Sequence, residues 1–86
     1  MTDASDPSRL RWRCRRGMQE LDILLGRWLE SRWSGASAEM QSAFEQLLDC
    51  EDDLIWDWLM GRDRPHPSLH RIVEDIREIG FGQPGP

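Results

Sequence analysis

Lysine is absent from this chain of 86 residues, and eleven arginines carry its positive charge. Guanidinium groups are planar and suit two-pronged contacts with carboxylates and phosphates. The sequence has no apolar run that approaches the 18 or more residues of a membrane span. It also has no apolar segment after the N-terminal charges, as an export signal would have. We therefore predict a cytoplasmic protein with no membrane span.

Cysteine is scarce as well. Cys14 and Cys50 lie far apart and form no C-x-x-C pair, which favours two reduced, partly buried thiols over a disulfide. Arginines on both sides of Cys14 would favour its thiolate, whereas a small buried side chain opposite Leu10 is the simpler interpretation. His66 and His70 have the spacing of two metal ligands on one helical turn, but an intervening proline makes a solvated helix start the better reading.

No glycine-rich phosphate loop occurs, and no histidine or aspartate near Cys14 suggests a catalytic base. The acidic residues 51–53 lack the alternating oxygen ligands of a calcium loop, so helix capping is the plainer account of them. We therefore expect neither an enzyme nor a metal site.

The charge that is present is distributed unevenly. Residues 1–17 carry five arginines and two aspartates, a net charge of +3, while residues 18–86 carry six arginines and fourteen acids, a net charge of −8. The five arginines fall within RLRWRCRRGMQELD, residues 9–22, and end directly before Gly17. This junction is the most unusual feature of the sequence.

Hydrophobic spacing predicts helices only, because no alternating pattern persists for the length of a strand. We predict an all-α fold, a single compact five-helix bundle over residues 7–80, with flexible segments at 1–6 and 81–86. The expected helices run from Pro7 to about Arg16, from Met18 to Trp33, from a Ser37 cap through Leu48, over residues 54–60 behind an Asp52 or Asp53 cap, and from Pro67 to Gly80.

Five tryptophans stand out in so short a chain. Trp56 and Trp58 are two apart, so on a helix they face nearly opposite ways, and Trp58 is the better core candidate. Trp56 is then partly exposed, as interface aromatics are. Trp12 shares a helical face with three arginines whose guanidinium groups could stack on its indole: Arg9, Arg13 and Arg16. For both of these tryptophans, simple filling of the core stays an alternative.

Two interpretations of the junction stay open on physical grounds. In the first, Gly17 supplies a left-handed turn at the end of the first helix, and Glu20 and Asp22 complement the dipole of the next helix. In the second, the bare glycine lets another backbone approach closely, between the opposite charges of Arg16 and Glu20. Such a corner would dock on a protein surface, with charge setting the register.

The segment RRGMQELD, residues 15–22, resembles the signature of the succinate dehydrogenase flavinylation factors, also called succinate dehydrogenase assembly factor 2 proteins. Their hallmark is an Arg-Gly-x-x-Glu element, here Arg16, Gly17 and Glu20. The resemblance continues in LLDCEDDLIWDWLMG, residues 47–61, and covers roughly residues 8–79. It implies a small five-helix bundle, in agreement with the spacing of the apolar residues.

The resemblance also implies a chaperone-like role. Members bind the flavoprotein subunit of succinate dehydrogenase, some also serve fumarate reductase, and they promote covalent attachment of FAD to a histidine of that subunit. The subunit's own site would perform the chemistry, so we expect this chain to hold no cofactor stably. We also expect it to be a monomer. The implied docking residues are Arg16, Gly17 and Glu20, with Arg9, Trp12, Arg15, Met18 and Asp52 as neighbours.

Two other functions remain as alternatives. Members of the same family have been described as antitoxin-like partners of a small membrane toxin, a role that Trp12 or Trp56 would serve equally well. The segment Arg9–Arg16 would also grip phosphates, but the net charge of −8 on the rest of the chain repels a nucleic-acid backbone. We therefore expect no nucleic-acid partner.

Overall fold

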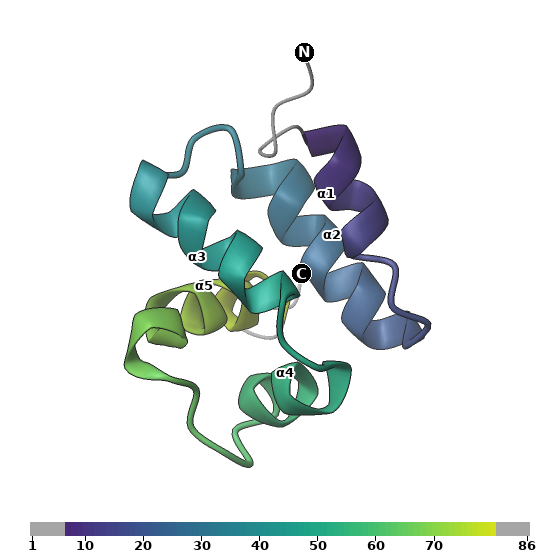
Figure 1. Cartoon of the computed structure of the whole chain (residues 1–86), viewed down its shortest axis with the longest axis vertical. Helices are drawn as coiled ribbons and strands as arrows, with labels where there is room; N and C mark the ends of the chain where they lie inside the picture. The colour runs from purple at the N-terminus through teal and green to yellow at the C-terminus, as the bar shows by residue number, and fades with distance from the viewer. Residues whose placement is uncertain (1–6, 81–86) are drawn as a thin grey trace, which may run out of the picture.

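The computed structural model describes residues 7–80, and within them it contains helices and no strand. The elements in chain order are α1 (Pro7–Arg13), α2 (Gln19–Arg32), α3 (Ala38–Leu48), α4 (Asp52–Leu59), the short 3-10 helix η1 (Pro67–Leu69) and α5 (His70–Gly80) (Figure 1). The predicted all-α, five-helix architecture is confirmed. The segments expected to be flexible, 1–6 and 81–86, lie outside the described residues.

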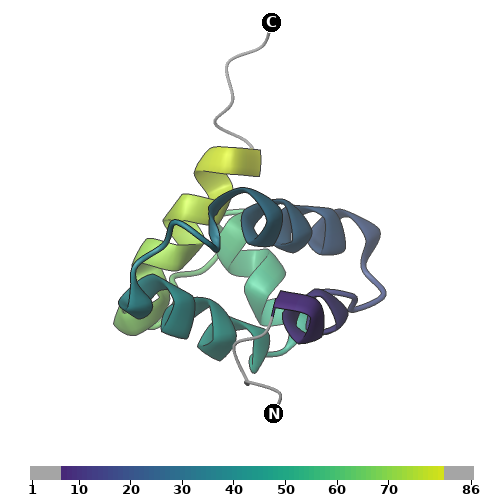
Figure 2. The ribbon, with the colours of Figure 1, turned by 90° about the horizontal axis from the view of Figure 1, so that it is seen from above.

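The last helix, α5, is the centre of the arrangement, because α2, α3, α4 and η1 all pack against it. The first helix packs against α2. Seen from above, α1 and α5 lie on opposite sides of the bundle (Figure 2). The α1–α2 linker and the turn between α3 and α4 lie side by side, because Arg16 donates to the carbonyl oxygens of Leu48 and Cys50, more than 30 residues away in sequence.

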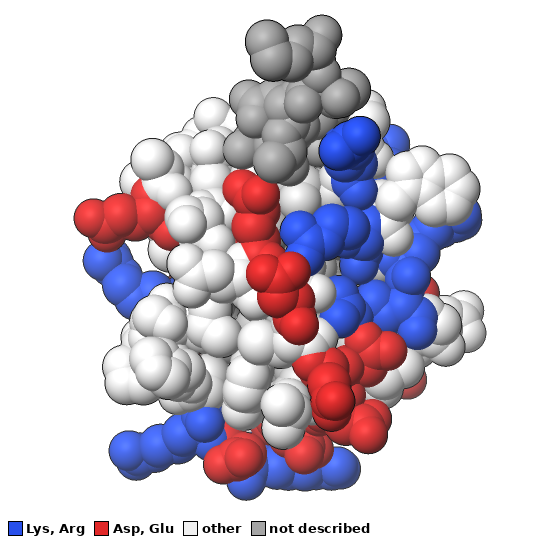
Figure 3. Space-filling model, in the orientation of Figure 1, with Lys and Arg blue, Asp and Glu red and all other residues white. Residues whose placement is uncertain are grey.

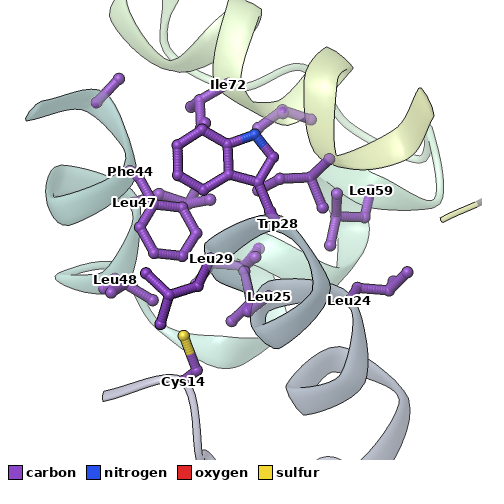
Figure 4. Packing of buried hydrophobic residues seen from close by; sticks show 14 of the residues in the cluster. Cys14, Leu24, Leu25, Trp28, Leu29, Phe44, Leu47, Leu48, Leu59 and Ile72 are labelled. Atoms are coloured by element: carbon purple, nitrogen blue, oxygen red, sulfur yellow. The ribbon is translucent and has the colours of Figure 1, made fainter. Parts of the chain in front are cut away.

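The core is built around aromatic rings. The rings of Trp28 and Phe44 stack with centroids 4.5 Å apart, and Trp33 meets both edge-on. Leucines and isoleucines from all the helices complete the cluster (Figure 4). The indole Nε1 of Trp28 donates to a carboxylate oxygen of Asp75 at 2.7 Å, and Arg32 pairs with the other oxygen at 2.7 Å. The largest core side chain thus has its one polar atom satisfied.

Several local predictions hold. Ser37 caps α3, with its Oγ accepting from the backbone N–H of Met40 at 3.1 Å. Trp58 is buried and Trp56 is half-buried, as their spacing predicted. The expected helix over residues 18–33 is present within one residue at each end, because Met18 and Trp33 are its caps.

The first helix is shorter than predicted. It ends at Arg13 rather than Arg16, and Gly17 therefore lies in the linker between α1 and α2 instead of at the end of a helix. The reason is tertiary, because the Arg16 side chain reaches Asp52 and the carbonyl oxygen of Leu48. In this position it also donates back to the carbonyl oxygen of Arg13 at 3.2 Å. This bond satisfies one of the carbonyls that a helix end leaves unpaired.

The starts of the last two α-helices also differ from the prediction. The cap of α4 is Glu51, not Asp52 or Asp53, and it makes no side-chain capping bond. The Asp52 carboxylate binds Arg16 instead. The segment that opens at Pro67 begins as the 3-10 helix η1 before α5 follows, and the ring Nδ1 of His66 accepts from the Ser68 N–H at 3.2 Å.

Candidate docking site

The glycine of the sequence signature adopts the left-handed conformation that the sequence suggested. Gly17 has a φ of +86°, a value that side-chain-bearing residues rarely adopt. The residue is exposed, and a Cβ placed on it would meet no atom within 4 Å. The backbone at Gly17 is therefore open to close approach from outside. We call residues 16–18 the Gly17 corner.

A carboxylate at the start of α2 holds the backbone of this corner. Asp22, in the first turn of α2, accepts from the backbone N–H of Arg16 at 2.9 Å and from that of Gly17 at 3.3 Å. Two successive amides converging on one carboxylate form a small anion-binding turn. Sequence reasoning placed Asp22 at the helix dipole and missed this contact, because an acidic residue in a first turn is too common to signal it.

The arginine of the signature points into the bundle. Its Nε pairs with the Asp52 carboxylate, its Nη1 donates to the carbonyl oxygens of Arg13 at 3.2 Å and Leu48 at 2.9 Å, and its Nη2 donates to that of Cys50 at 2.5 Å. Only 14% of the Arg16 side chain is exposed. Arg16 therefore does not flank the bare glycine as a free charge opposite Glu20, as the spacing suggested. Instead, it ties the linker to the α3–α4 turn.

A second pair crosses the same gap, because Arg13 forms an ion pair with Asp49. Both pairs join residues 36 apart in the sequence. No local pattern connects such residues, and so the sequence alone offered Asp52 only as a candidate helix cap and as a neighbour of the docking residues that the family resemblance implies. The structure brings Asp52 into direct contact with Arg16.

Beside the corner, the start of α2 and the exposed side of α4 enclose a pocket of about 340 Å³. Its lining residues are Met18, Gln19, Glu20, Leu21 and Trp56. Three of these five lining residues are apolar, and Glu20 is exposed. The pocket thus offers an apolar surface with one negative charge directly next to an accessible backbone. Trp56 supplies the half-buried aromatic wall, for which its spacing from Trp58 was the signal.

The surface of α1 is basic and carries an exposed tryptophan. Trp12 is 72% exposed, and the guanidinium of Arg15 lies 5.6 Å from the centroid of its ring. The predicted stacking partners, Arg9, Arg13 and Arg16, are wrong, because α1 ends before residue 16 and the linker turns Arg15 over the indole. Arg9 is exposed. Figure 3 shows arginines gathered over α1 and acidic side chains beside them toward α4.

Between α1 and α2 lies a further pocket of about 340 Å³, which adjoins the first because Gln19 lines both. It is bordered by Arg11, Arg15 and by Ile23, a side chain that is 47% exposed. Nothing in the local pattern singled out Ile23, which the helical spacing leaves outside the buried face. The basic surface of α1 and the Gly17 corner are therefore continuous.

Cys14 lines this second pocket and is buried, as expected. Burial raises the pKa of its thiol to about 11 and outweighs the opposing effect of Arg16. The thiolate that neighbouring arginines would favour is therefore not the form present at neutral pH. Cys50 is half-buried, and burial together with Asp49 raises its pKa as well. Both cysteines are free.

Within residues 7–80, no group of three or more histidine, cysteine or acidic side chains is arranged to hold a metal ion. His66 contacts Ser68, with 2.9 Å between Nδ1 and Oγ, whereas His70 lies 4.0 Å from Glu74. The two histidines thus have separate partners. Over the same residues, no helix has the length and apolar character needed to cross a bilayer.

Known proteins resemble this chain over nearly its whole length. Residues 8–80 match the family described as flavinator of succinate dehydrogenase. A protein of Xylella fastidiosa named FAD assembly factor SdhE is 51% identical over 80 residues, which cover 92% of this chain and 82% of that protein. Proteins with the same name from Coxiella burnetii and Pseudomonas aeruginosa are 39% and 42% identical, and the matches cover 92% and 88% of this chain and 98% and 92% of theirs. The chain therefore belongs to the family of flavinators of succinate dehydrogenase.

Proposed function

We propose that this chain is an assembly factor that binds the flavoprotein subunit of succinate dehydrogenase and promotes the covalent attachment of FAD to it. Membership of the family and the shared name of the relatives, FAD assembly factor, support this role. The observation that carries it is the Gly17 corner, an exposed left-handed glycine with open space around it, next to an apolar pocket. Fumarate reductase, a related flavoprotein, is a second candidate partner.

The geometry suits docking of a protein surface. The partner's main chain approaches Gly17, where no Cβ obstructs it, and an apolar side chain enters the pocket beside Trp56 and Met18. The exposed Glu20 and the arginines of α1 present opposite charges on the two sides of the corner, which sets the orientation of the partner more than the affinity. The exposed Trp12 and Arg15 belong to residue types that are enriched at binding hot spots.

Promotion of flavin attachment then follows from differential binding. A factor that binds one conformer of the subunit more tightly raises the population of that conformer. We propose that the favoured conformer is the one in which the subunit's own site forms the bond to the flavin. This chain contributes no catalytic group and holds no flavin stably in this proposal. Its Cys14 is protonated and buried, and its docking surface is built from apolar and singly charged side chains.

The same proposal places the protein in the cytoplasm as a monomer. Two free cysteines suit a reducing compartment. A single copy presents both sides of the docking corner, since the residues that form it come from one chain. The partner is a protein surface, and we propose neither nucleic acid nor a membrane as a ligand.

Gly17→Arg tests the proposal. The variant and the wild type are each co-expressed with the succinate dehydrogenase flavoprotein subunit, and covalent flavin is measured by in-gel fluorescence after denaturation. We expect attachment to fall to the level without the factor, because the new side chain occupies the space that the partner's backbone needs. The strain at positive φ costs only about 1 kcal/mol, so the fold persists. Glu20→Ala removes a charge without adding bulk and should give a milder loss.

Gly35→Arg is the matched control. Gly35 is also exposed, with open space where a Cβ would stand, but it lies between α2 and α3 and has no positive φ. This control variant should support full attachment. Full attachment by Gly17→Arg, with a melting temperature near that of wild type, would show that the corner does not bind the partner and would overturn the proposal.

A further inference from the structure

We infer that Arg16, Asp52 and Asp22 are positioning residues, which hold the Gly17 corner in place in the free chain and do not contact the partner. The inference rests on the proposed function and concerns the same surface. It reassigns the arginine of the family signature from a contact residue to an internal tie. Three observations carry it: the use of the guanidinium, the elements that it joins, and the hydrogen bonds of the corner amides.

The guanidinium of Arg16 has almost no capacity left for a partner. Arginine has five N–H groups, and four of those of Arg16 are directed at the Asp52 carboxylate and three carbonyl oxygens. The side chain is also largely buried. A partner carboxylate would have to displace these contacts and leave Asp52 without its cation, and removing one member of a shielded ion pair is costly. Exposed arginines such as Arg15 are available at no such cost.

The elements that Arg16 joins are those that form the docking pocket. Apart from the Arg13 carbonyl at the end of α1, its acceptors lie at the end of α3, in the α3–α4 turn and in the first turn of α4. Met18, two residues after Arg16, is one wall of the pocket, and Trp56, one helical turn after Asp52, is the other. The contact between Arg16 and Asp52 therefore sets the separation of the two walls. We call this contact, together with the three carbonyl bonds, the Arg16 latch.

Asp22 fixes the same linker to α2. Its carboxylate binds the amides of Arg16 and Gly17 at 2.9 and 3.3 Å and so holds the backbone in its left-handed turn. Arg16 is thus held twice, by its side chain to α4 and by its amide to α2. A surface ordered before binding loses less conformational entropy on association. The latch and Asp22 therefore raise affinity without touching the partner.

The first test is a double-mutant cycle on partner affinity. Arg16→Gln, Asp52→Asn and the double variant are titrated against the succinate dehydrogenase flavoprotein subunit. Both single changes break the same latch, so each should weaken binding about tenfold and the double variant no more than about tenfold. Asp53→Asn is the matched control, since Asp53 is an exposed neighbour of Asp52 that loses the same charge, and it should bind within about twofold of wild type. An Asp52→Asn variant with wild-type affinity beside a weak Arg16→Gln variant would show that Arg16 contacts the partner directly and would overturn the inference.

The second test needs no partner. Amide spectra of the free, ¹⁵N-labelled chain report the Gly17 N–H and the indole N–H of Trp56. Asp52→Asn should shift both signals, and Asp22→Asn should shift the Gly17 signal most, while Asp53→Asn leaves both near their wild-type positions. Unchanged signals in the Asp52 and Asp22 variants would mean that neither residue positions the corner.

Arg16→Lys adds a check on the chemistry of the latch. Lysine keeps the charge and carries three donors on a single atom, which cannot reach Asp52 and three carbonyl oxygens at once. We expect it to bind the partner as weakly as Arg16→Gln. Full rescue by lysine would reduce the latch to a simple charge effect and contradict the positioning role.

These outcomes are separable from failure of the proposed function. Full flavin attachment by Gly17→Arg would refute docking at the corner, whatever the spectra show. Loss of attachment by Gly17→Arg, together with wild-type behaviour of the Asp52 and Asp22 variants, would refute positioning alone. Should Arg16→Gln fail to fold, Asp52→Asn and Asp22→Asn still carry the test, because each removes a charge and keeps the size of the side chain.

Discussion

The aromatic core and the Gly17 corner are held together by different physics. Around Trp28 and Phe44, stacked rings and aliphatic side chains exclude water, and a single carboxylate satisfies the indole. At the corner, the linker is held by hydrogen bonds and ion pairs from an arginine, two aspartates and backbone carbonyls, in addition to the apolar contacts of Cys14 and Met18. Burial of apolar area is non-directional, whereas hydrogen bonds require particular distances and angles.

This difference separates stability from binding. The core decides whether the chain folds, because most of the apolar surface is buried there. The contacts at the corner set the positions of Met18, Gly17 and Trp56 relative to one another. Changes in the core should therefore act through the fraction of folded protein, and a change at the exposed Gly17 should act on the partner with little effect on melting.

The largest effect is expected from breaking the core with Trp28→Ala. Truncating a buried tryptophan costs about 3–5 kcal/mol, most of the stability of a domain of this size. The free energy of unfolding, from urea titration followed by circular dichroism, should fall by that amount, and flavin attachment should fall with it. A variant whose free energy of unfolding lies within about 0.5 kcal/mol of the wild-type value would show that Trp28 does not support the core.

A smaller effect is expected from pH, through the thiol that lies between the core and the corner. Burial raises the pKa of Cys14 from an ordinary 9.0 to about 11. The folded chain therefore binds this proton more tightly than the unfolded chain does. The resulting stability is complete below about pH 9 and is lost as the pH rises toward 11.

Alkylation measures this shift. In iodoacetamide at neutral pH, followed by mass spectrometry, the half-buried Cys50 should react before Cys14. The Cys14 rate should keep rising with pH beyond 9. Faster labelling of Cys14 than of Cys50 at neutral pH would mean that the arginines, and not burial, control its thiol.

The smallest effect on stability is expected from Trp12→Ala, which sharpens the comparison by repeating the Trp28 truncation at an exposed site. Trp12 is 72% exposed, so its removal should change the free energy of unfolding by no more than about 0.5 kcal/mol. Partner affinity should nevertheless fall, because the indole and the stacked Arg15 belong to the docking surface. Thermal melting and titration with the flavoprotein subunit separate the two results. Unchanged affinity would confine the docking surface to the Gly17 corner and its pocket.

Features of the sequence that act within one or two turns of chain were predictable. The apolar spacing of α2, α3 and α5, the Ser37 cap, the burial of Trp58 over Trp56 and the left-handed turn at Gly17 all depend on neighbours a few residues away. Such preferences belong to the residues themselves, so they survive into the fold. The family signature pointed to the same region of the chain as the candidate site, and the docking role of its residues stays a prediction.

The contacts that build the docking corner were decided only by the tertiary structure. Arg16 meets Asp52 across 36 residues, and the same contact ends α1 at Arg13 and leaves the cap of α4 to Glu51. Hydrophobic periodicity states which face of each helix is buried, but it does not state which helix ends meet. A long arginine next to a turn has many carboxylates within reach in an acidic chain. Only the packing of α2, α3 and α4 against α5 selects Asp52 and, with it, the shape of the surface that the partner is proposed to bind.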